Sequence, residues 1–328
     1  MISTAALKLR MYITLILSFA IGFTIIYALL LYMGLSTYYI MAFAALFFLF
    51  QWYASPYILA KASRIHYIKD DEYPQLHTMV KELAVQAGVP EPKIAIAPVK
   101  EPNAFVFGRS RKSATLVVHE GLLPLLDAKE LRAVLAHEIG HLRHNDVVVM
   151  TVVAFIPMLA YIVAQSMLWS GMWGEGRNNG SYILLFGLLA FVVYFIAELL
   201  VLSLSRTRES FADEYSATST KKPEYLASAL FKITSSNAGE QNASRGSTVA
   251  RSLYIIDFFS AEKDADDIKK NASAIRKLVP QADIEDLVKK AHQGRQGIFG
   301  VLGALLATHP STYRRIVELA KIKEEQNY

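Results

Sequence analysis

The stretch from Asp127 to Asp146 reads DAKELRAVLAHEIGHLRHND and contains the pattern HExxH at His137-Glu138-Ile139-Gly140-His141. In a helix the two histidines are one turn apart, so their imidazoles project from the same face and can hold a single Zn²⁺. Glu138 lies beside them and cannot easily be a third ligand. It can reach a water molecule on the metal, which predicts that Glu138 acts as a general base.

The residues around this pattern predict a helix. Asp127 is a good N-cap, and Glu130 completes a capping box three residues later. The apolar stripe that follows consists of Leu131, Val134, Leu135, Ile139 and Leu142. HExxH also occurs by chance in ordinary amphipathic helices, so a third ligand is needed to distinguish a metal site from such a helix.

The composition predicts an integral membrane protein. Of the 328 residues 53% are apolar and only 19% are charged, which is too apolar for a typical soluble enzyme. The chain has no cysteine, so His, Asp and Glu are the only candidate metal ligands. The net charge of +5 is modest and the basic residues cluster beside apolar runs, which indicates contact with a lipid bilayer rather than with nucleic acid.

Four apolar runs reach the length of about 20 residues that a membrane-spanning helix needs. They are Met11 to Gly34, Tyr38 to Leu59, Val147 to Trp169, and Ser181 to Leu204. The first is too long for the apolar part of a cleaved signal peptide, so we expect a retained anchor. Basic residues flank one side of the runs, at Lys8, Arg10, Lys61, Arg64, Lys69, Arg206 and Arg208. This asymmetry predicts that both termini and the active site lie in the cytoplasm, on the cell's inner or plasma membrane.

Glu198 interrupts the fourth run. An ionisable group at that depth is costly unless it is paired or near water. Two interpretations stay open: a glutamate in a polar seam, or a cavity that leads to the metal.

The segment between the second and third runs predicts a helix and a small sheet. Pro74 to Gly88 has helix boundary signals, and Lys93 to Pro98, Asn103 to Phe107 and Ala114 to His119 have strand patterns. A small sheet that leads into a metal-binding helix is a zincin layout, whose edge strand can pair with an extended peptide. Asn103, Ala104 and Phe105 are the candidate edge, although a purely structural strand is the alternative.

The third ligand is expected after the fourth run, where the sequence is SRTRESFAD. Glu209 and Asp213 are four residues apart and would face the same way on a helix. Paired acids are often only solvated surface, but here an apolar helical hairpin joins them to the HExxH helix at one membrane surface. We therefore expect Glu209 to complete the metal ligands and Asp213 to orient a ligand histidine.

HEIGHLRHND, followed after two apolar runs by SRTRESFAD, resembles the HtpX-like membrane zinc endopeptidases, which are gluzincins related to the CAAX prenyl proteases. The likeness extends to Asn103-Ala104-Phe105 with Gly108, Gly121-Leu122-Leu123, Thr308-His309-Pro310 and Arg315-Ile316. It implies one Zn²⁺ per chain with His137, His141 and Glu209 as ligands, Glu138 as base, and Asp213 as the orienting carboxylate.

The resemblance also suggests that His309 lies near the active site, where a histidine or arginine could stabilise an oxyanion. Arg315 is a second candidate for this role. A structural histidine before Pro310 and a salt bridge of Arg315 to a helix are the alternatives. His119 and His144 depart from the family pattern, and we do not expect either to be a ligand.

The expected fold is mainly helical, with four transmembrane helices and a cytoplasmic zincin-like α+β catalytic domain that carries a small sheet. Residues 1–60 and 147–204 would form transmembrane hairpins, and 61–146 and 205–328 the two parts of the catalytic domain. Within the second part, Ala261 to Lys270 is expected to be a solvated charge run. Ser235 to Ser247 is expected to be a loop, either a lid or an idle linker.

The expected function is a zinc-dependent endopeptidase that cleaves misfolded or damaged membrane proteins at the cytoplasmic face, as the resemblance implies. Its partners would be polypeptides and the bilayer. A CAAX-type prenyl endopeptidase and a non-catalytic membrane scaffold with a structural metal site are the alternatives. The intact Glu138 disfavours the scaffold, because a structural site needs no base. The oligomeric state is not predicted.

Overall fold

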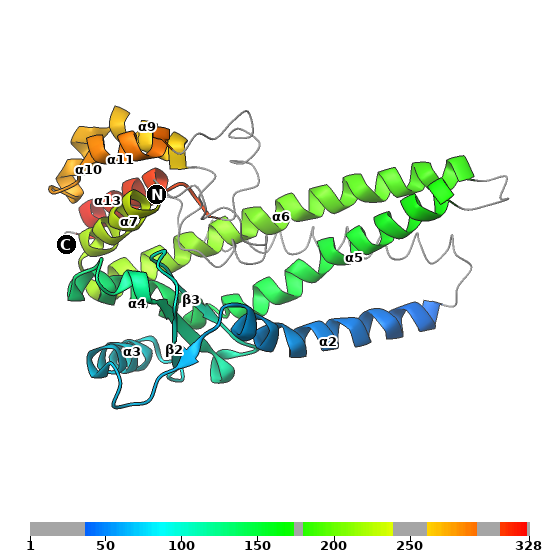
Figure 1. Ribbon diagram of the computed structural model, residues 1–328, viewed down its shortest axis with the longest axis horizontal. Coiled ribbons are helices and arrows are strands. Elements are labelled where there is room, and N and C mark those ends of the chain that lie inside the picture. The colour runs from blue at the N-terminus through cyan, green and yellow to red at the C-terminus, as the bar shows by residue number, and fades with distance from the viewer. Residues whose placement is uncertain (1–36, 174–179, 239–260, 294–308, 327–328) are drawn as a thin grey trace. The chain divides into compact units, whose positions relative to one another are not determined.

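The computed structural model describes residues 37–173, 180–238, 261–293 and 309–326, which are the coloured ribbon in Figure 1. They divide into two compact units. The first unit comprises residues 56–147 and 206–328, and the second comprises 2–55 and 148–205, each within the described ranges. The predicted first span, Met11 to Gly34, lies outside the described residues.

A four-stranded mixed sheet anchors the first unit. In chain order its strands are β1 (His66–Tyr67), β2 (Lys93–Ala97), β3 (Ala104–Phe107) and β4 (Thr115–His119). Their order in the sheet is β1-β2-β4-β3, with β2 and β4 parallel and both outer pairs antiparallel. The predicted strands therefore form, and β3 lies at an edge of the sheet. The two-residue strand β1 was not predicted from the sequence.

Side chains alternate across this sheet, as the pleat requires. One face contributes Ile94, Ile96, Leu116 and Val118 to the main core of the unit. The other face forms a smaller cluster that includes Phe105 and is covered by residues at the end of helix α2 (Thr37–Ala62). The sheet is thus buried on both sides.

Helices α3 (Pro74–Ala87) and α4 (Ala128–Arg143) pack together and share the main core. The predicted capping box of α4 is present: the Asp127 side chain accepts from the backbone N–H groups of Lys129 and Glu130, and Glu130 accepts from that of Asp127. The metal-binding pattern therefore lies on a helix whose start is fixed by its own sequence.

The C-terminal helices of the unit surround the core from another side. They are α7 (Pro223–Asn237), α9 (Ala261–Lys270), α10 (Ala272–Leu278), α11 (Ile284–Gln293) and α13 (Thr312–Gln326). Helix α13 packs against α7 and α9. The charge run Ala261 to Lys270, expected to be a solvated face, forms α9, which exposes Lys269 and Lys270 but buries Asp264, Ala265 and Ile268. Helix α7 extends to Asn237, so the predicted loop begins later, and its part beyond 238 lies outside the described residues.

The second unit consists of apolar helices. Helix α5 (Asp146–Trp173) packs against α6 (Gly180–Thr220) through Val153, Val201 and Leu204, and Phe155 of α5 makes an edge-on contact with Phe48 of α2 at 4.9 Å. Glu198 lies in α6 and is half-buried.

Within the described residues, two helical segments are long and apolar enough to cross a membrane, Asp146–Gln165 and Tyr182–Thr220. Only 28% and 22% of their most apolar windows are buried, whereas the core helix of a soluble protein buries most of its apolar surface. The predicted second span forms α2, which is not one of these two. Two of the four expected spans are therefore supported.

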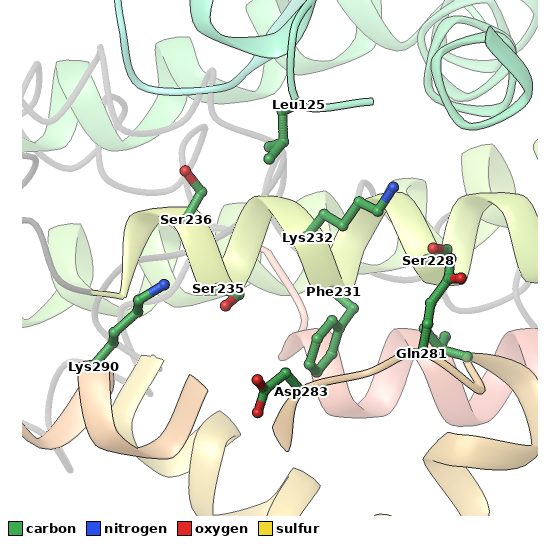
Figure 2. A pocket seen from close by; sticks show the side chains of 10 residues that line it. Leu125, Ser228, Phe231, Lys232, Ser235, Ser236, Gln281, Asp283 and Lys290 are labelled. Carbon is green, nitrogen blue, oxygen red and sulfur yellow. The ribbon is translucent and has the colours of Figure 1, made fainter. Parts of the chain in front are cut away.

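A concave surface of the first unit lies beside α7 and is lined by Phe231, Lys232, Gln281, Asp283 and Lys290 among others (Figure 2). Lys232 already pairs with Glu130, and Lys290 pairs with Asp286. None of the predicted site residues lines this surface. It is therefore separate from the chemistry that the sequence predicts.

Glu130 connects α4 to α7 inside the core. It is 2% exposed and accepts from the Ser228 hydroxyl and the Lys232 ammonium, both at 2.6 Å. Glu130→Ala removes the capping acceptor and leaves these donors without their partner, so we expect the free energy of unfolding to fall by about 3 kcal/mol. Thermal and denaturant unfolding of detergent-purified protein measure this change.

The matched control is Glu82→Ala, which removes an exposed pair with Arg132. This substitution is expected to change stability by less than about 0.5 kcal/mol. Equal effects of the two substitutions would contradict the assigned importance of the Glu130 contacts.

Candidate metal centre

The two histidines of HExxH lie on one face of α4. Their Nε2 atoms are 3.2 Å apart, and His137 is almost fully buried whereas His141 is partly exposed. The spacing of four residues on a regular helix produces this geometry, as the sequence predicts.

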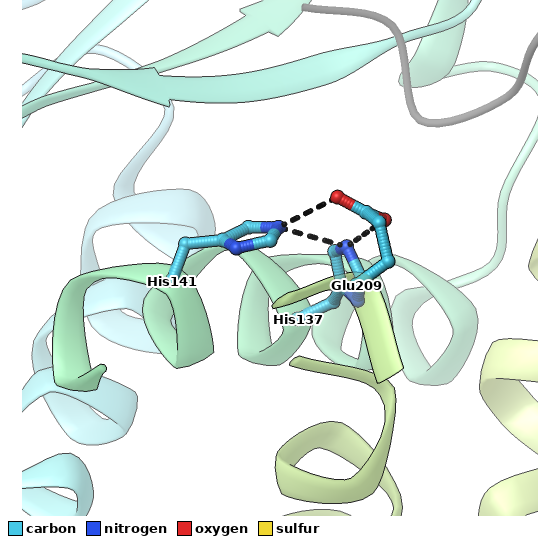
Figure 3. A group of neighbouring side chains, drawn as sticks. All are labelled: His137, His141 and Glu209. Carbon is cyan, nitrogen blue, oxygen red and sulfur yellow. Dashed lines mark hydrogen bonds and ion pairs between the residues drawn. The ribbon is translucent and has the colours of Figure 1, made fainter. Parts of the chain in front are cut away.

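Glu209 approaches both rings from α6 (Figure 3). One carboxylate oxygen lies 3.4 Å from His137 Nε2 and the other 3.4 Å from His141 Nε2. Ligand atoms of the three residues all lie within 4.8 Å of one another, so they could hold a metal ion. Two segments 68 residues apart in the chain, at His141 and Glu209, are thus brought together.

Gly140 permits this approach. A Cβ atom at position 140 would lie 3.2 Å from the Cα of Ala212 and 3.2 Å from the ring of Tyr215, both on α6. Nearby, the buried Ser216 hydroxyl donates to the Ala133 carbonyl of α4 at 2.7 Å. The absence of a side chain at position 140 therefore sets how closely the two helices cross.

Asp213 and Arg315 lie behind His137. His137 Nδ1 is 2.9 Å from Asp213, and Arg315 donates to both oxygens of that carboxylate at 2.8 and 2.7 Å. Burial lowers the pKa of His137, but the carboxylates of Asp213 and Glu209 outweigh burial and raise the pKa above its ordinary value. With Nδ1 directed at Asp213, the Nε2 atom faces Glu209.

Asp146 holds the second histidine in the same way. Its carboxylate lies 2.7 Å from His141 Nδ1 and also contacts the guanidinium of Arg208. No role for Asp146 is predicted from the sequence, and Arg208 is expected there only as a basic residue beside an apolar run. The available signal was an aspartate five residues after the second histidine, preceded by an asparagine that tolerates a left-handed backbone.

His309 and Arg315 lie close to Glu209, and Glu138 lies on α4 with the two histidines. His309 Nε2 is 3.5 Å from one Glu209 oxygen, and Arg315 Nη1 is 3.6 Å from the other. Glu138 is 3% exposed, and burial raises its pKa, against the opposing effect of His137 and His141. All of these side chains belong to the first unit.

The two histidines that were not expected to be ligands lie outside the metal group. His119 Nδ1 is 2.8 Å from the Glu101 carbonyl oxygen, and its ring contacts Phe105 edge-on at 5.9 Å. His144 packs against Phe211 and Tyr215, and burial lowers its pKa to about 4.

The buried charges fit a divalent cation. Four carboxylates, each no more than 5% exposed, lie in the group or next to it, at Glu138, Asp146, Glu209 and Asp213. Two buried guanidiniums, of Arg208 and Arg315, accompany them. Counted with ionised carboxylates and neutral histidines, the formal charge is two negative in excess, and uncompensated charge in a protein interior is costly. Imidazole and carboxylate donors are those that Zn²⁺ accepts.

Strand β3 lies at the sheet edge and packs against α4. Just before it, the Asn103 carbonyl accepts from the backbone N–H of His119 on β4 at 2.9 Å. Asn103, Ala104 and Phe105 are buried, at 1%, 1% and 5% exposure. The predicted edge residues thus stand beside the helix that carries the histidines.

A buried histidine pair on one helix with a glutamate from a second helix beside it is the arrangement with which a gluzincin-type metallopeptidase would hold a metal ion. Comparison with known proteins agrees with this class. The model of Peptidase family M48 matches residues 70–323. A Protease HtpX homolog of Methanothermobacter thermautotrophicus is 40% identical over 235 residues, covering 71% of this chain and 87% of the relative. Another, of Thermoplasma acidophilum, is 33% identical and covers 97% of both chains.

The chain therefore belongs to Peptidase family M48, and it is a metalloprotease. Among solved structures, the crystal structure of S. mikatae Ste24p is similar at 19% identity with a TM-score of 0.49, covering 96% of this chain and 67% of that one. The family implies a bound metal ion.

The close crossing at Gly140 predicts a graded effect of side-chain size. Gly140→Ala requires the neighbouring helix to shift by a few tenths of an ångström, whereas Gly140→Leu forces α4 and α6 apart. We expect Gly140→Leu to lose most of its bound zinc and Gly140→Ala to keep more of it. Metal analysis of purified protein gives the zinc content, and Ala128→Leu at an exposed position of α4 is the control. Full zinc content in Gly140→Leu would show that the crossing does not set the site.

Proposed function

We propose that the chain is a zinc-dependent endopeptidase in which His137, His141 and Glu209 hold one Zn²⁺. The observation that carries this proposal is the convergence of the three side chains in a buried setting, where carboxylates outnumber guanidiniums. A zinc ion held by these residues supplies a Lewis acid that polarises the peptide carbonyl and lowers the pKa of water.

Glu138 is the proposed general base. It lies on the histidine helix next to His137, so it stands near the metal group without being part of it. It accepts a proton from the attacking water and returns that proton to the amine that leaves. Burial raises the pKa of Glu138 toward the range in which one carboxyl group can both accept a proton and donate it again.

Two carboxylate contacts give separate roles to His309 and Arg315. Arg315 binds Asp213 with two hydrogen bonds, which supports a role in positioning the carboxylate that orients His137. His309 approaches the Glu209 carboxylate from the segment before α13, on the side of the proposed metal ligands. It is the better candidate to donate to the oxyanion of the attacked carbonyl.

The edge strand β3 is the proposed substrate-binding element. An extended peptide that pairs with the outer side of β3 would lie along α4, because that helix packs against the strand. Main-chain pairing accepts many sequences, which suits an enzyme that removes diverse damaged proteins.

The proposed substrates are misfolded or damaged membrane proteins cut at the cytoplasmic face. Two helical segments of the chain have the length and apolar character of membrane spans. Basic residues flank one side of the apolar runs, which supports a cytoplasmic catalytic unit in the inner or plasma membrane. The matches to HtpX-type proteases favour this function over a prenyl-protein peptidase or a non-catalytic scaffold.

The proposal predicts that Glu138→Gln keeps its zinc but loses proteolysis. The amide has nearly the same shape as the carboxylate but cannot accept the proton, and loss of a general base lowers the rate by roughly 10²–10⁴-fold. Casein degradation by detergent-purified protein measures the activity, and metal analysis measures the zinc.

Glu120→Gln, at an exposed position before α4, is the matched control and is expected to keep both properties. A chelator should abolish casein degradation by the unsubstituted chain, and added Zn²⁺ should restore it. A Glu138→Gln protein with full activity would refute the assigned base.

A further inference from the structure

We propose that Asp146 and Arg208 form a second positioning pair, which fixes the ring of His141 as Asp213 and Arg315 fix that of His137. This inference rests on the proposed metal site and concerns residues outside the ligand set. It assigns a specific task to the sequence His144-Asn145-Asp146 that follows the HExxH helix.

The hydrogen bond to Asp146 selects one form of His141. An ionised carboxylate can only accept, so His141 Nδ1 must carry the proton that bridges the 2.7 Å to Asp146. The neutral ring then has a lone pair at Nε2, the nitrogen that faces Glu209 at 3.4 Å. A carboxylate on the far nitrogen of a metal-binding histidine fixes its tautomer and orientation and makes it a more basic ligand.

The backbone reaches this position through a left-handed residue. On an uninterrupted helix, residues five apart point roughly 140° away from each other, so Asp146 could not contact His141. Helix α4 ends at Arg143, Asn145 has φ of 60°, and α5 begins at Asp146. Asparagine adopts this conformation more readily than most residues. The turn therefore brings the Asp146 carboxylate to the histidine side of α4.

Arg208 pairs with the Asp146 carboxylate inside the protein. Asp146 and Arg208 are each only 4% exposed, and their side chains are in direct contact. Arg208 also donates to the His144 carbonyl at the C-terminal end of α4, where the helix dipole favours a cation. Because Arg208 precedes Glu209 on α6, this pair connects the His141 ring to the residue before the third ligand.

The two pairs form equivalent supports for the two histidines. Each ring has Nδ1 on an aspartate, and each aspartate contacts a buried arginine. Asp213 and Arg315 come from α6 and α13, whereas Asp146 and Arg208 come from the start of α5 and from α6. Loss of either aspartate should therefore loosen one ligand and leave the other in place.

A purely structural role for Asp146 makes a different prediction. As the first residue of α5 it also stabilises a helix N-terminus. Loss of that stabilisation would lower the stability of the metal-free protein without changing its affinity for zinc. Zinc affinity is thus the property that separates a positioning role from a structural one.

The test compares Asp146→Asn and Asp146→Ala with the unsubstituted full chain in detergent. Zinc dissociation constants come from competition with a chromogenic chelator, and thermal unfolding of the metal-free proteins reports stability. We expect the zinc affinity of Asp146→Asn to fall by about 10-fold and that of Asp146→Ala by up to about 100-fold. The loss is smaller for Asp146→Asn because the amide oxygen can still accept the hydrogen bond from His141. The amide has no charge to pair with Arg208, so some affinity is still lost.

The control is Asp127→Asn, which changes the acid at the start of α4 and should leave zinc affinity unchanged. Asn145→Gly, which retains access to the left-handed conformation, should bind zinc normally, whereas Asn145→Val should bind it less tightly.

An Asp146→Asn protein that binds zinc as tightly as the unsubstituted chain would overturn the inference, and this variant decides the question if Asp146→Ala does not fold. Failure of the unsubstituted chain to bind zinc would instead refute the proposed function. The two failures are therefore distinguishable.

Discussion

The close crossing of α4 and α6 at Gly140 is the constraint on which the metal centre depends. His137 and His141 lie on either side of Gly140 on α4, and Glu209 and Asp213 lie on either side of Ala212 on α6. Contact between Gly140 and Ala212 therefore places His137 and His141 opposite Glu209, the third proposed ligand, and opposite Asp213, which contacts the His137 ring. The hydrogen bond from Ser216 to the Ala133 carbonyl holds the same crossing further along both helices.

A second requirement is the balance of buried charge. Carboxylates are needed to bind a cation, to accept a proton and to orient two imidazoles, and burial makes each of them costly. Arg208 and Arg315 compensate two of these charges at the outer carboxylates, Asp146 and Asp213. The inner carboxylate of Glu209 lies 3.4 Å from both imidazole Nε2 atoms, where a divalent ion could neutralise its charge. Because the two arginines pair with the outer carboxylates, the negative charge that is left lies beside the two histidines.

Much of this arrangement could be predicted from local sequence. HExxH, the capping box at Asp127 and the four-residue spacing of Glu209 and Asp213 depend only on helix geometry, and these elements form as expected. The role of Asp146 could not be predicted, because it depends on the left-handed Asn145 and on Arg208, 62 residues further along the chain. The burial of one side of α9 was not predicted, because the segment is mostly charged and its few apolar residues are buried only by packing against other helices. The β1 strand has two residues, too few for any periodicity.

X-ray absorption at the zinc edge of the detergent-purified chain reports the atoms around the ion without requiring a substrate. We expect one zinc per chain with two imidazole nitrogens at about 2.0–2.1 Å and carboxylate oxygen at about 2.0–2.2 Å. Glu209→Ala should remove the carboxylate contribution, and Glu138→Gln should leave the spectrum unchanged. If fewer than two imidazoles surround the ion, or if Glu209→Ala does not alter the spectrum, His137, His141 and Glu209 do not hold the zinc together.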